Sequence, residues 1–203
     1  MNYKELIKEY MRDQKYMLIL ILGFIVTIFV GIIIVHELSL KTFIVLALSC
    51  ILFIGLYFYR KKKFNDIYEN LSEEEQKELD SDINQTYFFS GKDYALSSKY
   101  IINFKSPKII KYSSILIIDK ITGIVKHGHQ NHACDMVYIV TKNEKISLII
   151  KEYGTIKLQP KAQYSEGYYE GLYSYIKAQN PNVLEGYTKE NRKKIKEKYN
   201  IKI

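Results

Sequence analysis

Two long runs of apolar residues without a charge constrain this chain more than any other feature. The first spans Met17 to Val35 and the second spans Thr42 to Tyr59, with the six residues HELSLK between them. A helix needs about 20 residues to cross a hydrocarbon core of roughly 30 Å. Because a backbone in lipid must satisfy its own hydrogen bonds, we expect a transmembrane helical hairpin with spans 17–35 and 42–59.

A cleaved signal peptide and a pair of buried helices in a soluble core are the alternatives for these runs. The first run is longer than a usual signal-peptide core, and HEL follows it instead of a small-residue cleavage motif. Charge-free runs of this length are uncommon in small soluble domains. We therefore favour a multi-pass membrane protein with two spans.

Lysine and arginine flank the two runs on their outer sides. Four of these residues precede the first run, and Arg60, Lys61, Lys62 and Lys63 follow the second, whereas the loop between the runs has only Lys41. The positive-inside rule then predicts that both termini are on the cytoplasmic side of the cell membrane.

The net charge of +8 is unevenly distributed along the chain. Residues 1–63 and residues 189–203 each carry a net +5, while residues 64–188 carry a net −2. Basic segments next to a bilayer attract anionic lipid head groups, and we predict that role for residues 60–63 and for Arg192, Lys193 and Lys194. A nucleic-acid-binding protein would need a basic stripe on its soluble part, so nucleic acid is not an expected partner.

Small residues recur every four positions within the first run, at Gly23, Thr27 and Gly31. Such a stripe lets two helices approach closely in a membrane. It could serve the packing of the two spans against each other or the interface of a homodimer.

The segments around the spans have helical patterns of their own. Residues 1–16 are predicted to form an amphipathic helix that leads into the membrane or lies on its surface. Residues 60–85 are predicted to be a basic stop followed by a connector helix from about Glu73 to Ile83, because Ser72 and Glu75 form a capping-box pattern.

Residues 86–179 are predicted to form one soluble domain. Tyr94 and Leu96, followed by Tyr100, Ile102 and Phe104, are spaced to share one face of a strand pair. Short strands with tight turns predict a small antiparallel barrel or sandwich. A tyrosine-rich helix ends this domain at Asn180-Pro181, and residues 180–203 are predicted to be a tail with a short basic helix.

The strand region also carries a family resemblance. Its apolar spacing matches a two-part pattern at Tyr94, Leu96, Ser97, Tyr100, Ile101 and Ile102, and then at Ile109, Ile110, Tyr112, Ser113 and Ile115. This pattern resembles the opening hairpins of pleckstrin-homology-like (PH-like) domains of bacterial membrane-anchored proteins. Ser97, Lys111 and Ser114 depart from the threonine, proline and aspartate usual in that family.

The resemblance covers about Tyr87 to Ile176 and implies a small β-barrel or sandwich that a C-terminal helix closes. Members of that family commonly have two transmembrane helices, and most have no assigned activity. The resemblance assigns no activity, because fold does not imply function. Our own expectation is a non-enzymatic scaffold or interaction module at the membrane, with a protein partner or a homodimer. It does not imply phosphoinositide binding, because the turn between the first two strands supplies only Lys99.

The segment KHGHQNHACD holds three of the four histidines and one of the two cysteines. If Gln130-Asn131 formed a two-residue turn, four side chains would project from one face of the hairpin. Such a set suits Zn²⁺ or copper, and its members would be His127, His129, His132 and Cys134. The alternatives are pH sensing by the imidazoles and an exposed polar loop.

No motif of a known catalytic class is present in the sequence. Cys134 with His132 or His129 is a formal nucleophile–base pair, but nothing near it suggests an oxyanion site. We therefore expect a membrane-anchored, non-enzymatic protein without a required cofactor. A metal- or pH-responsive sensor and an enzyme are the alternatives.

Overall fold

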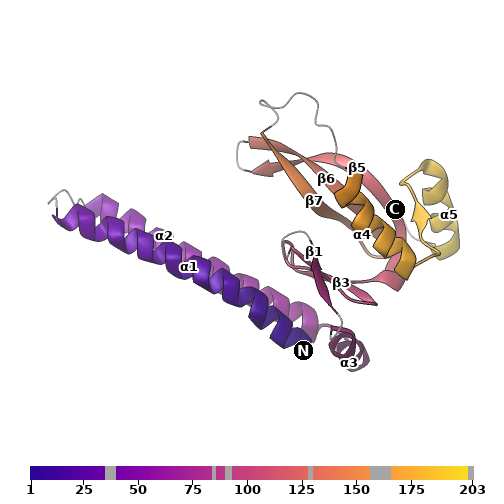
Figure 1. Cartoon of the computed structure of the whole chain (residues 1–203), viewed down its shortest axis with the longest axis horizontal. Coiled ribbons are helices and arrows are strands. Elements are labelled where there is room, and N and C mark those ends of the chain that lie inside the picture. The colour runs from indigo at the N-terminus through magenta and orange to yellow at the C-terminus, as the bar shows by residue number, and fades with distance from the viewer. Residues whose placement is uncertain (35–39, 84–85, 90–92, 128–129, 156–165, 201–203) are drawn as a thin grey trace. The chain divides into compact units, whose positions relative to one another are not determined.

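The computed structural model describes residues 1–34, 40–83, 86–89, 93–127, 130–155 and 166–200. The chain forms two compact units, a helical unit of residues Met1–Gln85 and an α+β unit of residues Thr86–Ile203 (Figure 1). The sequence predicts this division between a helical part and a part with strands.

Helices α1 (Tyr3–Ile34) and α2 (Leu40–Glu69) are antiparallel and lie side by side in the helical unit (Figure 1). The helix α1 has no break near residue 16, so the predicted amphipathic helix and the predicted first span are one element. The helix α2 continues ten residues past Tyr59, through the basic residues 60–63. Lysine and arginine are good helix formers and no proline interrupts either segment, which accounts for the extra length.

Both helices are long and apolar enough to cross a membrane, and their apolar stretches are not buried in the protein. Among the described residues, every large apolar side chain that is exposed, other than Met1 and Ile124, lies between Tyr16 and Tyr59. A helix pair in the core of a soluble protein would bury this surface. The structure thus supports membrane association for this part of the chain.

The start of α1, the end of α2 and the helix α3 (Glu73–Asp82) pack together. We call residues 3–15, 57–69 and 73–83 the helical base. The capping box predicted at Ser72 and Glu75 is present, with both reciprocal hydrogen bonds. The apolar side chains of the first turns of α1 are buried within the protein and do not lie on a bilayer surface; they are Tyr3, Leu6, Ile7, Tyr10 and Met11.

The α+β unit contains two four-stranded sheets. The first is antiparallel in the order β1 (Tyr87–Phe89), β2 (Tyr94–Leu96), β3 (Tyr100–Asn103), β4 (Lys108–Lys111). The 3-10 turn η2 (Tyr112–Ser114) leads into the second sheet, which has the order β7-β6-β5-β8. Its strands are β5 (Ile115–His127), β6 (Gln130–Thr141), β7 (Lys145–Thr155) and β8 (Leu184–Glu185), with β8 parallel to β5.

The register between β2 and β3 corrects one detail of the predicted strand faces. Leu96 pairs with Ile101 and Ala95 pairs with Ile102. Directly paired residues lie on the same face of a sheet, so Ile101, and not Ile102, shares the face of Tyr94 and Leu96. The turn between the strands decides this register, and periodicity alone does not specify it.

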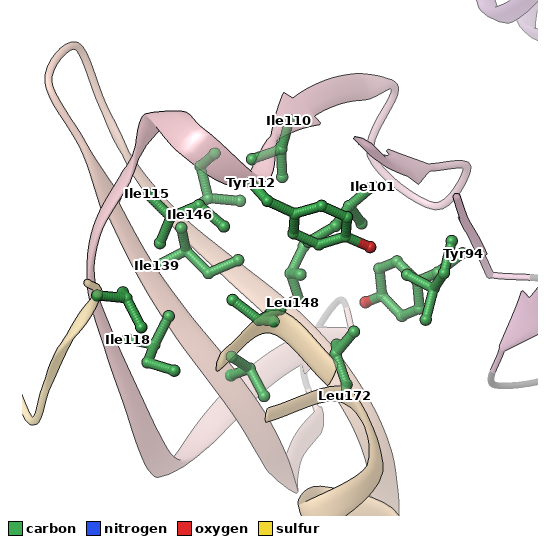
Figure 2. Close-up of a cluster of buried hydrophobic side chains, with 14 of the residues drawn as sticks. Tyr94, Ile101, Ile110, Tyr112, Ile115, Ile118, Ile139, Ile146, Leu148 and Leu172 are labelled. Carbon is green, nitrogen blue, oxygen red and sulfur yellow. The ribbon is translucent and has the colours of Figure 1, made fainter. Parts of the chain in front are cut away.

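The main core of the α+β unit lies between the two sheets and α4 (Glu166–Gln179). Figure 2 shows side chains from both sheets gathered around one centre, with Leu172 of α4 among them. Leu172 and Ile176 are fully buried, as their helical spacing predicts. Tyr175 packs at the margin of this core and donates a 3.0 Å hydrogen bond from its hydroxyl to the backbone carbonyl of Ser97.

The chain after Pro181 covers the opposite face of the second sheet. The helix α5 (Lys189–Tyr199) buries Ile195 against Leu116, Ile117 and Val140. Neighbouring residues of a strand point to opposite faces, and Ile118 accordingly belongs to the main core. The predicted basic tail is therefore an integral layer of the α+β unit (Figure 1).

The second part of the chain is thus an α+β structure with two sheets and a helix packed on them. Within the described residues, no strand pairing joins the two sheets into a closed barrel.

We predict that Ile195→Ala loosens α5 and β8 without unfolding the main core. Truncating a buried isoleucine costs about 2–5 kcal/mol, and Ile195 is 4% exposed. Hydrogen exchange of the full chain in detergent micelles should become faster over residues 184–199. The exposed neighbour Lys196 is the control, since Lys196→Ala should leave exchange unchanged. Equal protection in the two variants would contradict the packing role of α5.

Candidate functional site

Aromatic side chains fix α1 and α2 to each other in the helical base. The ring of Tyr3 stacks on that of Tyr68, with 4.9 Å between the ring centroids and 6° between the ring planes. The Tyr3 hydroxyl donates a hydrogen bond of 3.2 Å to the backbone carbonyl of Phe64. The Phe64 ring meets that of Tyr10 edge-on, with centroids 6.0 Å apart. The first turns of α1 are therefore held against the last turns of α2.

Asp80 connects α3 to both long helices. One oxygen of its carboxylate accepts a hydrogen bond from the backbone N–H of Tyr3 at 2.8 Å, and the other accepts one from the Tyr68 hydroxyl at 2.7 Å. The N–H of Tyr3 lies in the first turn of α1, where backbone donors have no helical acceptor and a negative charge is favoured. Asp80 thus caps α1 although it belongs to α3. The sequence gives no sign of this role, because Asp80 lies in a segment rich in acidic residues.

The four basic residues that follow the second apolar run differ in their surroundings. The guanidinium of Arg60 donates a hydrogen bond of 2.8 Å to the Tyr10 hydroxyl and lies 5.5 Å from the centroid of that ring. Lys61, Lys62 and Lys63 are exposed. Arg60 therefore stabilises the helical base itself, while the three lysines present their charges to the surroundings.

A groove of about 720 Å³ runs along the helical base between α1 and α2. Ile7 and Met11 line its apolar part, and polar side chains at helical spacing line each side. The side formed by α2 carries Tyr57, Lys61, Asn65 and Glu69, and the side formed by α1 carries Lys4, Glu5, Lys8, Glu9, Arg12 and Lys15. The sequence shows the basic residues but gives no sign that they surround a single groove.

The small-residue stripe lies on an exposed side of α1. A Cβ atom added at Gly23 or Gly31 would meet no described atom within 4 Å, and the Thr27 hydroxyl donates to the Gly23 carbonyl of its own helix at 2.9 Å. Larger residues of α1, such as Ile25 and Phe29, are the partly covered ones. The stripe therefore does not pack α1 against α2, and its use in a homodimer stays a prediction.

The basic residues of α5 are held within the α+β unit. The guanidinium of Arg192 lies 5.0 Å from the centroid of the Tyr187 ring, and the Lys145 ammonium lies 5.3 Å from it. The hydrogen bond with Lys145 lowers the pKa of the Tyr187 hydroxyl. Lys193 and Lys194 are exposed and pair with glutamates within α5. Lipid contact by Arg192, Lys193 and Lys194 stays a prediction.

The pairing of β5 with β6 sets the register of the histidine hairpin. His127 pairs with Gln130, and Lys126 pairs with Asn131. Gln130 and Asn131 therefore do not form the two-residue turn on which the one-face arrangement of four ligands was conditional, because both residues pair with β5. Gln-Asn is not a strong pair for a two-residue turn, so the sequence could not specify the register. His129 and the side chain of His127 lie outside the described residues.

His132 and Cys134 share one face of β6, because they are two residues apart. Cys134 pairs with Glu152 of β7, and the Nδ1 atom of His132 is 3.9 Å from the Glu152 carboxylate. The ammonium of Lys105 contacts the other oxygen of that carboxylate, and its charge would oppose a metal ion there. No group of three or more possible metal ligands occurs among the described residues. The four-residue metal site stays a prediction.

Comparisons of the chain with models of protein families, with curated proteins and with solved structures found no match.

We predict that the Cys134 thiol reacts slowly with maleimide in the folded protein. Its side chain is 0% exposed, and burial raises the pKa of the thiol. Since the thiolate is the reactive form, a raised pKa means that less of it is present at neutral pH and that the rate increases only in alkaline solution. Mass spectrometry of a Cys50→Ala variant would follow this reaction.

The same variant unfolded in guanidinium is the control and should react at the rate of a free thiol. Rapid modification of the folded protein at pH 7, slowed by added Zn²⁺, would contradict this prediction. It would favour the metal site at the histidine hairpin.

Proposed function

We propose that this chain is a membrane-anchored, non-enzymatic interaction module. The hairpin of α1 and α2 spans the cell membrane with both termini on the cytoplasmic side. The α+β unit is a PH-like domain that binds a protein partner near the membrane.

The observation that carries this proposal is the distribution of exposed apolar side chains. Among the described residues they concentrate on α1 and α2 between Tyr16 and Tyr59, whereas the continuations of both helices in the helical base bury their apolar side chains. The change occurs next to Lys15 on α1 and next to Arg60 on α2. Tyrosine and basic residues at the ends of apolar helices are typical of a membrane–water interface.

The packing of the helical base bears on the signal-peptide alternative. A signal peptide is removed from the mature protein. Here the residues before the first apolar run supply much of a folded cluster, including the Tyr3–Tyr68 stack and the contact of Tyr3 with Asp80. Removal of α1 would take away the Tyr3 and Tyr10 side chains that contact Phe64, which is fully buried. This supports an anchor that is retained.

The arrangement of the α+β unit supports the proposed PH-like fold. Two mainly antiparallel sheets follow each other along the chain, and α4 comes after them and packs on the core that they share, in the order that the resemblance implies. Tyr94, Ile101 and Ile110, which belong to the matching pattern, lie in the main core (Figure 2). The additional layer of β8 and α5 distinguishes this chain.

Buried polar side chains in the described part of the α+β unit support a non-enzymatic role, because turns and strand pairs use them. The Ser97 hydroxyl donates to the Tyr100 carbonyl at 3.1 Å, and Asn103 accepts from the backbone N–H of Ser106 at 3.0 Å. Asp135 lies 3.4 Å from the Thr122 hydroxyl on the paired strand. An active site would be expected to direct such groups toward a shared cavity.

We predict that the full chain stays in the membrane fraction after alkaline carbonate extraction. In a variant whose native cysteines are replaced, Ser39→Cys should react with an impermeant maleimide in intact cells. Ser113→Cys should react only after the cells are permeabilised. Release by carbonate would contradict the anchor, and the opposite labelling pattern would contradict the orientation.

The role of the α+β unit as an interaction module is tested by replacing the anchor and the α+β unit one at a time. We expect cross-linked partners to be recovered with the full chain and with a chimaera that joins an unrelated transmembrane hairpin to residues 86–203. They should be lost when residues 1–85 carry an unrelated soluble domain, because the α+β unit makes the contact. Recovery of the same partners with residues 1–85 alone would contradict the proposal.

A further inference from the structure

The groove of the helical base has a positive end and a mixed end. Glu5 and Glu69 line the groove near the start of α1 and the end of α2, which is the end farther from the apolar segments. Arg12, Lys15 and Lys61 line the end nearer to them. Glu9 lies one turn before Arg12 on α1, and its carboxylate is 3.9 Å from the Arg12 guanidinium. The end of the groove next to the apolar helices therefore has a net positive charge.

No ion pair of Lys15 or Lys61 is present among the described residues, and both side chains are exposed. The two residues are on different helices, one immediately before the exposed apolar surface of α1 and the other just after that of α2. Tyr16 is 59% exposed and Tyr59 is 66% exposed. A ligand between these lysines would thus have cationic donors on one side and apolar helix surface on the other.

We propose that this groove binds one anionic phospholipid, with the phosphate between Arg12, Lys15 and Lys61 and the acyl chains along α1 and α2. The inference depends on the proposed insertion in a membrane and names a ligand for the helical base. Basic pockets between transmembrane helices on the cytoplasmic side are suited to such head groups. A volume of about 720 Å³ is in the range of small-molecule sites.

Charge and apolar surface together decide between a lipid and a soluble anion. The Arg12 guanidinium and the two ammonium groups supply charge-assisted hydrogen bonds to a phosphate of either kind. These cations are exposed to water, where such contacts are weak. A lipid adds burial of its chains against the exposed side chains that begin at Tyr16, a gain that inorganic phosphate lacks.

Native mass spectrometry of the delipidated full chain in detergent would test the site. The first binding constant is measured for phosphatidylglycerol and for phosphatidylcholine with the same acyl chains. Lys15→Gln combined with Lys61→Gln should weaken phosphatidylglycerol binding by at least about tenfold, from the loss of two head-group cations. The matched control is Lys62→Gln with Lys63→Gln, which removes two charges near the groove but outside its lining. We expect that control to bind as the unchanged chain does.

Lys15→Arg with Lys61→Arg keeps the charges and should retain binding, which separates loss of charge from loss of structure. Equal weakening in the two glutamine variants would overturn the site in favour of general surface attraction. Equal binding of the two lipids would also overturn it, as would displacement of the lipid by excess inorganic phosphate. These outcomes would leave the proposed anchor intact if the chain still resists carbonate extraction, whereas release by carbonate would contradict the anchor itself.

Discussion

The side chains of α1 and α2 between Tyr16 and Tyr59 need a hydrocarbon environment, because each helix covers only one side of the other. Transfer of a large apolar side chain out of water is worth about 1.5–3 kcal/mol. Among the described residues of this segment, eighteen such side chains are exposed, each by 36–68%. Even with only that fraction in water, their summed transfer free energy is comparable to the stability of a typical domain, about 5–15 kcal/mol. The proposed location of this segment in a membrane constrains what its two ends can do.

At the end where both helices leave the apolar region, the chain replaces lipid contact with protein contact. Tyr3, Phe64 and Tyr68 supply the aromatic packing, and Asp80 supplies acceptors for a backbone donor and a hydroxyl. The basic residues there have two different roles. Arg60 is part of the packing, whereas Lys15 and Lys61 remain available at the groove. The charge pattern from which the orientation is predicted therefore contains both structural positions and the positions of the proposed ligand site.

Local signals in the sequence were sufficient for part of this structure. The apolar helices and the capping box at Ser72 each depend on residues that are close together along the chain. Contacts between distant residues could not be predicted in this way. Asp80 caps a helix that begins 77 residues earlier, and Ile195 completes a layer against strands that are far away in sequence. The hairpin register around Gln130 escaped prediction because no residue there strongly favours one turn.

The absence of a break in α1 over its described length, Tyr3–Ile34, has a mechanical consequence. A transmembrane helix adapts to the thickness of its bilayer by tilting. A helix without a hinge transmits that tilt along its whole length, and α1 is bound to α2 and α3 at its base. In the proposed membrane insertion, a change in bilayer thickness would therefore change the tilt of α1 and, with it, the orientation of the helical base at the membrane surface.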